Sequence, residues 1–375
     1  MQKNTAIFAG IMSGTSTDGT DGILARFTPG QAPLQLGSHY QPFDSHLKSL
    51  LLALAASKSC AFEQLAEAEH LLTHHYAQTL KQLQVLTPNI NIRAAGCHGQ
   101  TLEHRPSGPH PYTLQLLNPS LLSELTGIDI ICDFRRRDLA AGGQGAPLVP
   151  AFHQHCFQST HEPRFIVNLG GIANITWLPP GPTQTPLGFD TGPANLLLDA
   201  WMQQVHQKPC DQDGETARSG EINEQWLAAL LDEPYFTQAW PKSTGREQFN
   251  INWVKQRLPA LHETDFASVT MLTTLAELTA ESLAQPIRQL DPQSQANIYL
   301  CGGGAYNTYL VERIRARLEP RKVDTTDSLG MPPSQVEAFA FAWLAWRFME
   351  GQPNNLASAT GASGPRRLGG HYPAR

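Results

Sequence analysis

The chain has 375 residues, 41% of them hydrophobic and 16% charged, which is typical of a globular protein and favours two domains. A formal net charge of −6 gives no electrostatic reason to bind nucleic acid, and six scattered cysteines without a Cys-x-x-Cys pair indicate free thiols in a reducing compartment. The longest apolar runs fall well short of the ~20 residues that span a bilayer, so we expect a cytoplasmic protein that does not enter a membrane.

The N-terminal part alternates extended and helical patterns. Residues 5–12 are apolar, 13–19 have turn chemistry and 20–27 are extended again, which predicts a strand–turn–strand unit and not a signal peptide. Helical spacing covers 44–86. A short strand over 90–95 leads into a loop at 96–99, and the proline-rich stretch 104–119 predicts a further loop.

A glycine-rich stretch at 140–147 follows three consecutive arginines and favours either a mobile connection or close approach of backbone to a ligand. We place the domain boundary there. The N-terminal domain is predicted over 1–140, with the tail 351–375 packing loosely back on it. The C-terminal domain is predicted over 141–350.

The second half repeats the strand–turn–strand pattern over 165–177. Residues 188–193 are predicted to enter a helix with Pro193 at its first position. Helices are predicted over 264–289, from about 306 and over 334–349, with a strand over 297–301. Strands that alternate with helices predict an α/β protein, and the two glycine-turned hairpins suggest two related halves that face one cleft.

The first hairpin turn, residues 14–21, superficially matches a P-loop, but Thr20 stands where that motif needs lysine, so we reject a Walker A site. The glycines could instead let backbone N–H groups point at phosphate oxygens. Asp18 or Asp21 could hold Mg²⁺, through water because Mg²⁺ dehydrates reluctantly. The alternative is an ordinary hairpin turn.

Two later glycine segments could also approach a nucleotide. The turn at 168–174 carries Gly170 and Gly171 and can present N–H groups in the same way. Gly302, Gly303 and Gly304 follow a buried-type strand and precede a predicted helix, whose N-terminus suits phosphate. Each segment is equally compatible with a plain turn.

Asp190 is the best candidate for a general base, because glycines surround it and a predicted helix start follows it. Phosphoryl transfer needs a positioned carboxylate, Mg²⁺ and backbone donors more than covalent chemistry. The alternative is a local helix cap, which the nearer Gly192 weakens.

Several polar residues could bind a sugar. His98, Gln100 and Thr101 follow a strand end and suit hydroxyl groups, although a lone histidine is more often structural. Glu337 completes a capping-box pattern that begins at Ser334, which favours a cap on pattern alone. The arginine run could clamp a carboxylate or remain a solvated basic stretch; its members are Arg135, Arg136 and Arg137. A histidine- and cysteine-containing stretch at 153–161 matches no standard zinc site.

Seven segments together resemble the anhydro-N-acetylmuramic acid kinase family over almost the whole chain. They are residues 10–19, 97–101, 133–135, 141–147, 168–174, 188–193 and 302–307. Thr17 and Ala194 depart from the residues usual in the family, and Ala194 bears on how closely a ligand approaches the following helix.

The resemblance implies two α/β domains of the actin-like, hexokinase-like and heat-shock ATPase superfamily that close on ATP. It implies that water opens the 1,6-anhydro ring of N-acetylmuramic acid while O6 takes the γ-phosphoryl group, in the recycling of cell-wall sugars by a dimer. By the same resemblance Asp190 is the base on that water, Asp18 lies near Mg²⁺ and Glu337 reaches the sugar. The implied ATP contacts are Gly14, Thr15, Ser16, Thr17, Asp18, Gly19, Thr20, Asp21, Gly170, Gly171, Gly302, Gly303, Gly304 and Asn307. The alternatives are a kinase for another sugar and a non-catalytic actin-like ATP-binding protein.

Overall fold

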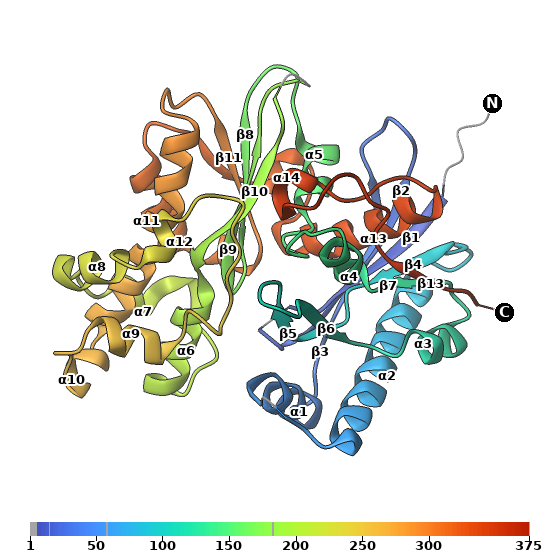
Figure 1. Cartoon of the computed structure of the whole chain (residues 1–375), viewed down its shortest axis with the longest axis horizontal. Coiled ribbons are helices and arrows are strands. Elements are labelled where there is room, and N and C mark those ends of the chain that lie inside the picture. Colours follow the sequence, from blue (N-terminus) through green and yellow to red (C-terminus); the bar gives the residue numbers. More distant parts are fainter. Residues whose placement is uncertain (1–5, 15, 58, 182–183, 375) are drawn as a thin grey trace. The chain divides into compact units, whose positions relative to one another are not determined.

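The structure is a computed structural model and describes residues 6–374 except 15, 58, 182 and 183. It forms two compact units (Figure 1): unit 1 comprises Met1–Cys156 with Gln335–Arg375, and unit 2 comprises Phe157–Ser334. These limits differ from the predicted boundaries at 140 and 350. Helix α13 (Val336–Met349) packs on strands of unit 1, and Phe152 of α5 (Pro150–Phe157) stacks on Phe339 of α13, so both segments belong to unit 1.

The central sheet of unit 1 has the strand order β13-β7-β4-β1-β2-β3. Strands β1, β2 and β3 pair antiparallel, β4 is parallel to β1, β7 is parallel to β4, and β13 pairs antiparallel with β7. The strands are β1 (Ala6–Met12), β2 (Gly19–Phe27), β3 (Leu34–Pro42), β4 (Ala94–Cys97), β7 (Ile130–Cys132) and β13 (Gly370–Tyr372). A separate two-stranded ladder joins β5 (Gln100–Arg105) to β6 (Tyr112–Leu116).

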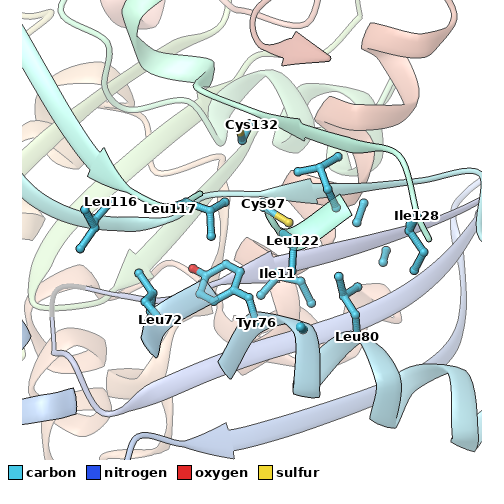
Figure 2. Packing of buried hydrophobic residues seen from close by; sticks show 14 of the residues in the cluster. Ile11, Leu72, Tyr76, Leu80, Cys97, Leu116, Leu117, Leu122, Ile128 and Cys132 are labelled. Carbon is cyan, nitrogen blue, oxygen red and sulfur yellow. The ribbon is translucent and has the colours of Figure 1, made fainter. Parts of the chain in front are cut away.

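Side chains of β1 alternate between two packed layers. Ile11 lies in a core that α2 (Phe62–Leu86) completes with Leu72, Tyr76 and Leu80 (Figure 2). Gly10 points the other way, since a Cβ placed on it would lie only 1.9 Å from the Ala338 carbonyl oxygen of α13. The remaining helices of unit 1 are α1 (Ser45–Ala56), α3 (Pro119–Thr126), α4 (Phe134–Ala140) and α14 (Ala357–Thr360).

The sheet of unit 2 repeats the topology of unit 1. Its order is β10-β9-β8-β11-β12, with β8, β9 and β10 antiparallel and β11 and β12 parallel to β8. The strands are β8 (Arg164–Leu169), β9 (Ile172–Leu178), β10 (Leu187–Pro193), β11 (Asn297–Cys301) and β12 (Val323–Thr325). The prediction of an α/β protein made of two related, actin-like halves is therefore confirmed.

Helices α11 (Val269–Leu290) and α12 (Thr308–Leu318) pack together and contribute to the core on the sheet of unit 2 (Figure 1). A second apolar core joins α11 to the shorter helices around Trp201. Those helices are α6 (Asn195–His206), α7 (Glu215–Arg218), α8 (Glu224–Leu231), α9 (Ile251–Arg257) and α10 (Glu263–Phe266). The 3₁₀ turns are η1 (Gln212–Gly214), η2 (Pro234–Thr237), η3 (Gly303–Tyr306), η4 (Thr326–Leu329) and η5 (Pro333–Gln335). Among the described residues, every helix is too short or too polar to span a bilayer.

Three local predictions are wrong. The stretch 188–193 is the edge strand β10, and Pro193 ends it because proline is tolerated at the end of an edge strand; α6 begins only at Asn195. The proline-rich stretch 104–119 contains β6. The tail does not pack loosely, because Asn354 and Leu368 are fully buried in unit 1.

Candidate active site

The turn between β1 and β2 carries the predicted phosphate contacts, of which Thr15 lies outside the described residues. Its Gly14 carbonyl accepts hydrogen bonds from the Thr17 N–H at 3.2 Å and from Gln100 Nε2 at 3.1 Å. Thr17 adopts a left-handed backbone conformation with a φ of 55°. A left-handed residue in a short turn can aim neighbouring N–H groups at an anion.

The side chains of this turn point in different directions. Asp18 is exposed and accepts a hydrogen bond from the Ser16 hydroxyl at 2.9 Å. Thr20 is fully buried, and its hydroxyl pairs with Thr79 of α2 at 2.9 Å. The Thr20 side chain therefore packs on the α2 side of the sheet, away from solvent.

Two carboxylates of unit 1 act on a third, that of Asp21. Burial, with the charges of Asp18 and Glu337, raises the pKa of Asp21 to about 7. Burial, with the charges of Asp18 and Asp21, raises the pKa of Tyr40 to about 12. Excess negative charge of this kind would repel a triphosphate unless a cation accompanied it.

Mg²⁺ fits this region as a water-mediated ion. Within the part of the chain that the structure describes, no three metal-ligating side chains converge closely enough to hold an ion by themselves. Asp18 offers an exposed carboxylate, and phosphate oxygens with water could complete the octahedral shell that Mg²⁺ prefers.

Glu337 lies in the first turn of α13, but the capping-box interpretation is wrong. Gln335 is the N-cap, and its side chain makes no capping hydrogen bond. The Gln335 amide instead donates to the Ser38 hydroxyl at 3.1 Å. The Glu337 carboxylate contributes to the negative charge around Asp21.

The structure brings His98 and Arg135 together. Arg135 donates from Nε and Nη2 to His98 Nε2 at 3.2 and 2.9 Å, and from Nη1 to the Gly145 carbonyl at 2.8 Å. Burial and the Arg135 charge hold the pKa of His98 well below its usual range, so the imidazole is neutral. Arg137 lies on the same helix, α4, and is exposed.

Gln100, a predicted sugar-binding residue, keeps its Oε1 buried without a hydrogen-bond partner among the described residues. Buried polar atoms are normally satisfied, so a ligand or water is the natural partner. Thr101 differs, because its hydroxyl accepts from Gln115 Nε2 at 3.2 Å. The ring of His98 lies against the backbone of Ser13 and Gly99, whose hydrogen bonds oppose the lowering of its pKa.

Sequence reasoning missed the residues that organise the glycine-rich loop. The fully buried Asp138 accepts from the Gly145 N–H and from the Thr360 hydroxyl, both at 2.8 Å. The Gln144 N–H donates to the Thr360 carbonyl at 2.7 Å. Asp138 directly follows the arginine run, and nothing in its local pattern indicates that a tail residue more than two hundred positions away would bind it.

Asp190 lies on β10 in unit 2, next to an irregularity in the pairing with β9, and is nearly buried. Its Oδ2 accepts from the Thr244 N–H at 3.1 Å. The N-cap of α6 is Ala194, so Asp190 does not cap that helix. A buried carboxylate held by a backbone donor has a defined orientation, as a general base requires.

The β8–β9 turn, which carries Gly170 and Gly171, has a packing role in unit 2. The carbonyls of Gly170 and Gly171 accept from the N–H groups of Asn195 and Ala194, which fastens the β8–β9 turn to the start of α6. These bonds use the carbonyls of the turn, and the prediction that its own N–H groups bind a phosphate stays a prediction.

The third glycine segment leaves room at one position. A Cβ at Gly302 would lie 2.4 Å from Asn168 Oδ1 and one at Gly304 would lie 2.7 Å from Leu169 Cβ, whereas one at Gly303 would meet nothing within 4 Å. Asn307 caps α12 by accepting from the Leu310 N–H. Gly303, just before the N-terminus of α12, is therefore the position where a ligand could approach most closely.

The two units share one sheet topology, apart from the additional strand β13 of unit 1; unit 1 carries the predicted phosphate turn and unit 2 the buried Asp190. A model of the family described as anhydro-N-acetylmuramic acid kinase matches residues 6–374. The chain belongs to this family, which confirms the predicted resemblance.

Relatives that bear this name extend over the full length of the chain. One from Hahella chejuensis is 46% identical over 99% of this chain and 100% of its own. One from Burkholderia orbicola is 48% identical over 98% of this chain and 96% of its own. One from Shewanella sp. strain MR-4 is 44% identical over 99% of this chain and 100% of its own.

Proposed function

We propose that this chain uses ATP and water to convert 1,6-anhydro-N-acetylmuramic acid into N-acetylmuramic acid 6-phosphate and ADP, a step in the cytoplasmic recycling of cell-wall sugars. Membership of the kinase family over the whole chain carries this proposal. We further propose that it acts as a homodimer.

Asp190 acts as the general base. It removes a proton from the water whose oxygen bonds to the anomeric carbon, while the bond from that carbon to O6 breaks. O6 then bonds to the γ-phosphorus as the bridge to ADP breaks, and Asp190 later releases its proton to solvent. The bonded and nearly buried carboxylate supports this role, because positioning lowers the barrier for both steps.

In unit 1, the turn at 14–21 contacts the triphosphate, with Asp18 on Mg²⁺ through water. When bound, Mg²⁺ neutralises charge that develops on the phosphoryl oxygens. In unit 2, Gly303 and its neighbours admit the nucleotide. The proposed sugar contacts are His98, Gln100, Thr101, Arg135, Arg137 and Glu337, with neutral His98 able to hydrogen-bond a hydroxyl group.

Product analysis in ¹⁸O-labelled water tests the reaction. We expect ATP and the anhydro sugar to give a sugar phosphate with the label on the anomeric carbon, since hydrolytic opening places the water oxygen there. ADP release with glucose or ordinary N-acetylmuramic acid alone would favour a kinase for another sugar. ATP binding without any sugar phosphate would favour a non-catalytic protein.

Asp190→Asn tests the base. The variant should bind ATP normally and lose at least roughly a hundredfold in turnover, because the amide cannot accept the proton. Asp232→Asn is the matched control, since Asp232 belongs to the same unit and its side chain is 89% exposed. Turnover at the wild-type rate in Asp190→Asn would remove Asp190 from the mechanism.

A further inference from the structure

One segment of unit 2, residues 235–244, binds Asp190 through its backbone N–H, its backbone carbonyl and its carboxylate. The Asp190 N–H donates to the Lys242 carbonyl at 3.0 Å, and the Asp190 carbonyl accepts from the Tyr235 hydroxyl at 2.8 Å. The Thr244 N–H binds its carboxylate. Because β10 is the edge strand, its outward backbone groups need such a partner.

The same segment also packs on the irregular part of β10. Gly192 has a φ of 149°, and a Cβ placed on it would lie 2.7 Å from Phe236 Cε1. The pairing of β10 with β9 shifts register between Asp190 and Gly192. The ring of Phe236 therefore packs against Gly192, two residues after the proposed base, and leaves no room for a side chain there.

Lys242 joins the two ends of this segment. Its Nζ donates to the carbonyls of Tyr235 and Phe236 at 2.8 and 3.1 Å and lies 4.5 Å from the Tyr235 ring centroid. The side chain is buried, and none of the ion pairs found in the described part of the chain includes it. Lysine is rarely buried without a carboxylate partner, so a specific role is expected.

The charge of Lys242 acts on Asp190. Burial lowers the pKa of Lys242 to about 8, and the Asp190 charge opposes that shift. Tyr235, the other titratable group against the ammonium, has a raised pKa because of burial and the charges of Asp190 and Glu247. By reciprocity, a positive charge that Asp190 stabilises must also favour the ionised form of Asp190.

We propose that Lys242 is a positioning residue for Asp190, because its bonds to the Tyr235 and Phe236 carbonyls close the segment that binds Asp190 and hold its ammonium group within that segment. This inference rests on the proposed function of Asp190. The alternative is that Lys242 only stabilises the fold of the segment, with no effect on the protonation of Asp190.

Lys242→Met separates these possibilities, because methionine keeps much of the side-chain volume and removes the charge. We expect kcat to fall at least roughly tenfold, with the KM for ATP unchanged. The acid limb of the pH profile of kcat/KM should move to higher pH, because Asp190 loses a nearby positive charge. Lys242→Arg, which keeps the charge, should leave that limb at its wild-type position.

Lys255→Met is the matched control. Lys255 is an exposed lysine of α9 whose Nζ lies 5.1 Å from the Phe266 ring centroid, so the substitution removes a similar cation–ring contact away from Asp190. It should leave turnover and the pH profile unchanged. Tyr235→Phe removes the hydroxyl that binds the Asp190 carbonyl without removing charge, and should lower kcat without moving the acid limb.

An acid limb at the wild-type position in Lys242→Met would overturn the inference, whatever happens to kcat. If Lys242→Met does not fold, a wild-type kcat in Tyr235→Phe would overturn it, because the segment would then not position the base. Failure of the proposed function is distinct, since it appears as wild-type turnover in Asp190→Asn.

Discussion

Replacing Gly96 with alanine should destabilise unit 1 because helix α13 leaves no space for a side chain there. A Cβ on Gly96 would lie 1.9 Å from the Phe341 carbonyl oxygen and 3.1 Å from Ala345 Cβ. Ordinary contact begins near 3.4 Å, so the helix or the strand would have to move by about 1.5 Å. Both atoms belong to α13, a helix with few exposed residues, and neither can rotate away.

The expected cost is about 3 kcal/mol, at the upper end of the range for overpacked cores, because the obstacle is backbone and not a flexible side chain. Urea unfolding followed by tryptophan fluorescence measures this loss, and Trp343 and Trp346 on α13 report on the affected layer. The KM for the sugar should also rise, since Glu337 lies in the first turn of the displaced helix.

Gly37→Ala is the control, because a Cβ on Gly37 of β3 would meet only Thr87 Cγ2, at 3.4 Å. It should change the free energy of unfolding by no more than about 0.5 kcal/mol. Equal urea midpoints for Gly96→Ala and Gly37→Ala would refute the reasoning from close approach.

Three further substitutions test other parts of the chain. Glu277→Gln removes a fully buried carboxylate that binds two arginines of α12, and it should lower the free energy of unfolding by about 2 kcal/mol. Glu312→Gln, in an exposed ion pair, should lower it by no more than about 1 kcal/mol. Equal losses for the two variants in urea unfolding would contradict this prediction. Thr360→Val removes a donor to buried Asp138 and should raise the KM for the sugar while the KM for ATP is unchanged; steady-state kinetics showing no change would separate the tail from the site. The raised pKa of Asp21 means that its ionisation destabilises the fold fully above about pH 7, and this effect is lost only as the pH falls to about 4. Asp21→Asn should therefore raise the urea midpoint of the nucleotide-free protein at about pH 8 but not at about pH 4.

The hairpins and their glycines were predictable from sequence because an apolar run, a glycine turn and a second apolar run are local signals. The strand β10 could not be predicted from the sequence, because Gly188 and Pro193 are also typical of the start of a helix. Only pairing at the edge of the sheet stabilises an extended conformation there. The sequence predicted that His98 and Arg135 belong to the same sugar site, but it did not predict that they bond to each other.

The partners of Asp190 escaped sequence reasoning for a physical reason. Lys242 and Thr244 lie about fifty positions further along the chain, in a stretch rich in polar and turn-forming residues that is typical of a surface loop. Their bonds to Asp190 depend on how η2 packs against β10, which is a tertiary contact. The same holds for Asp138, whose partner Thr360 comes from the far end of the chain.

The division of the chain into a continuous unit 2 and an interrupted unit 1 sets an order for folding during synthesis. Everything that unit 2 needs has left the ribosome when residue 334 emerges, while unit 1 still lacks the helix that covers Gly10 and Gly96. Synthesis of unit 1 begins first, but its folding is completed last. Until α13 has emerged, one apolar face of the unit 1 sheet is uncovered and prone to aggregate. Shortening the C-terminus by even a few tens of residues should consequently impair yield out of proportion to the length removed.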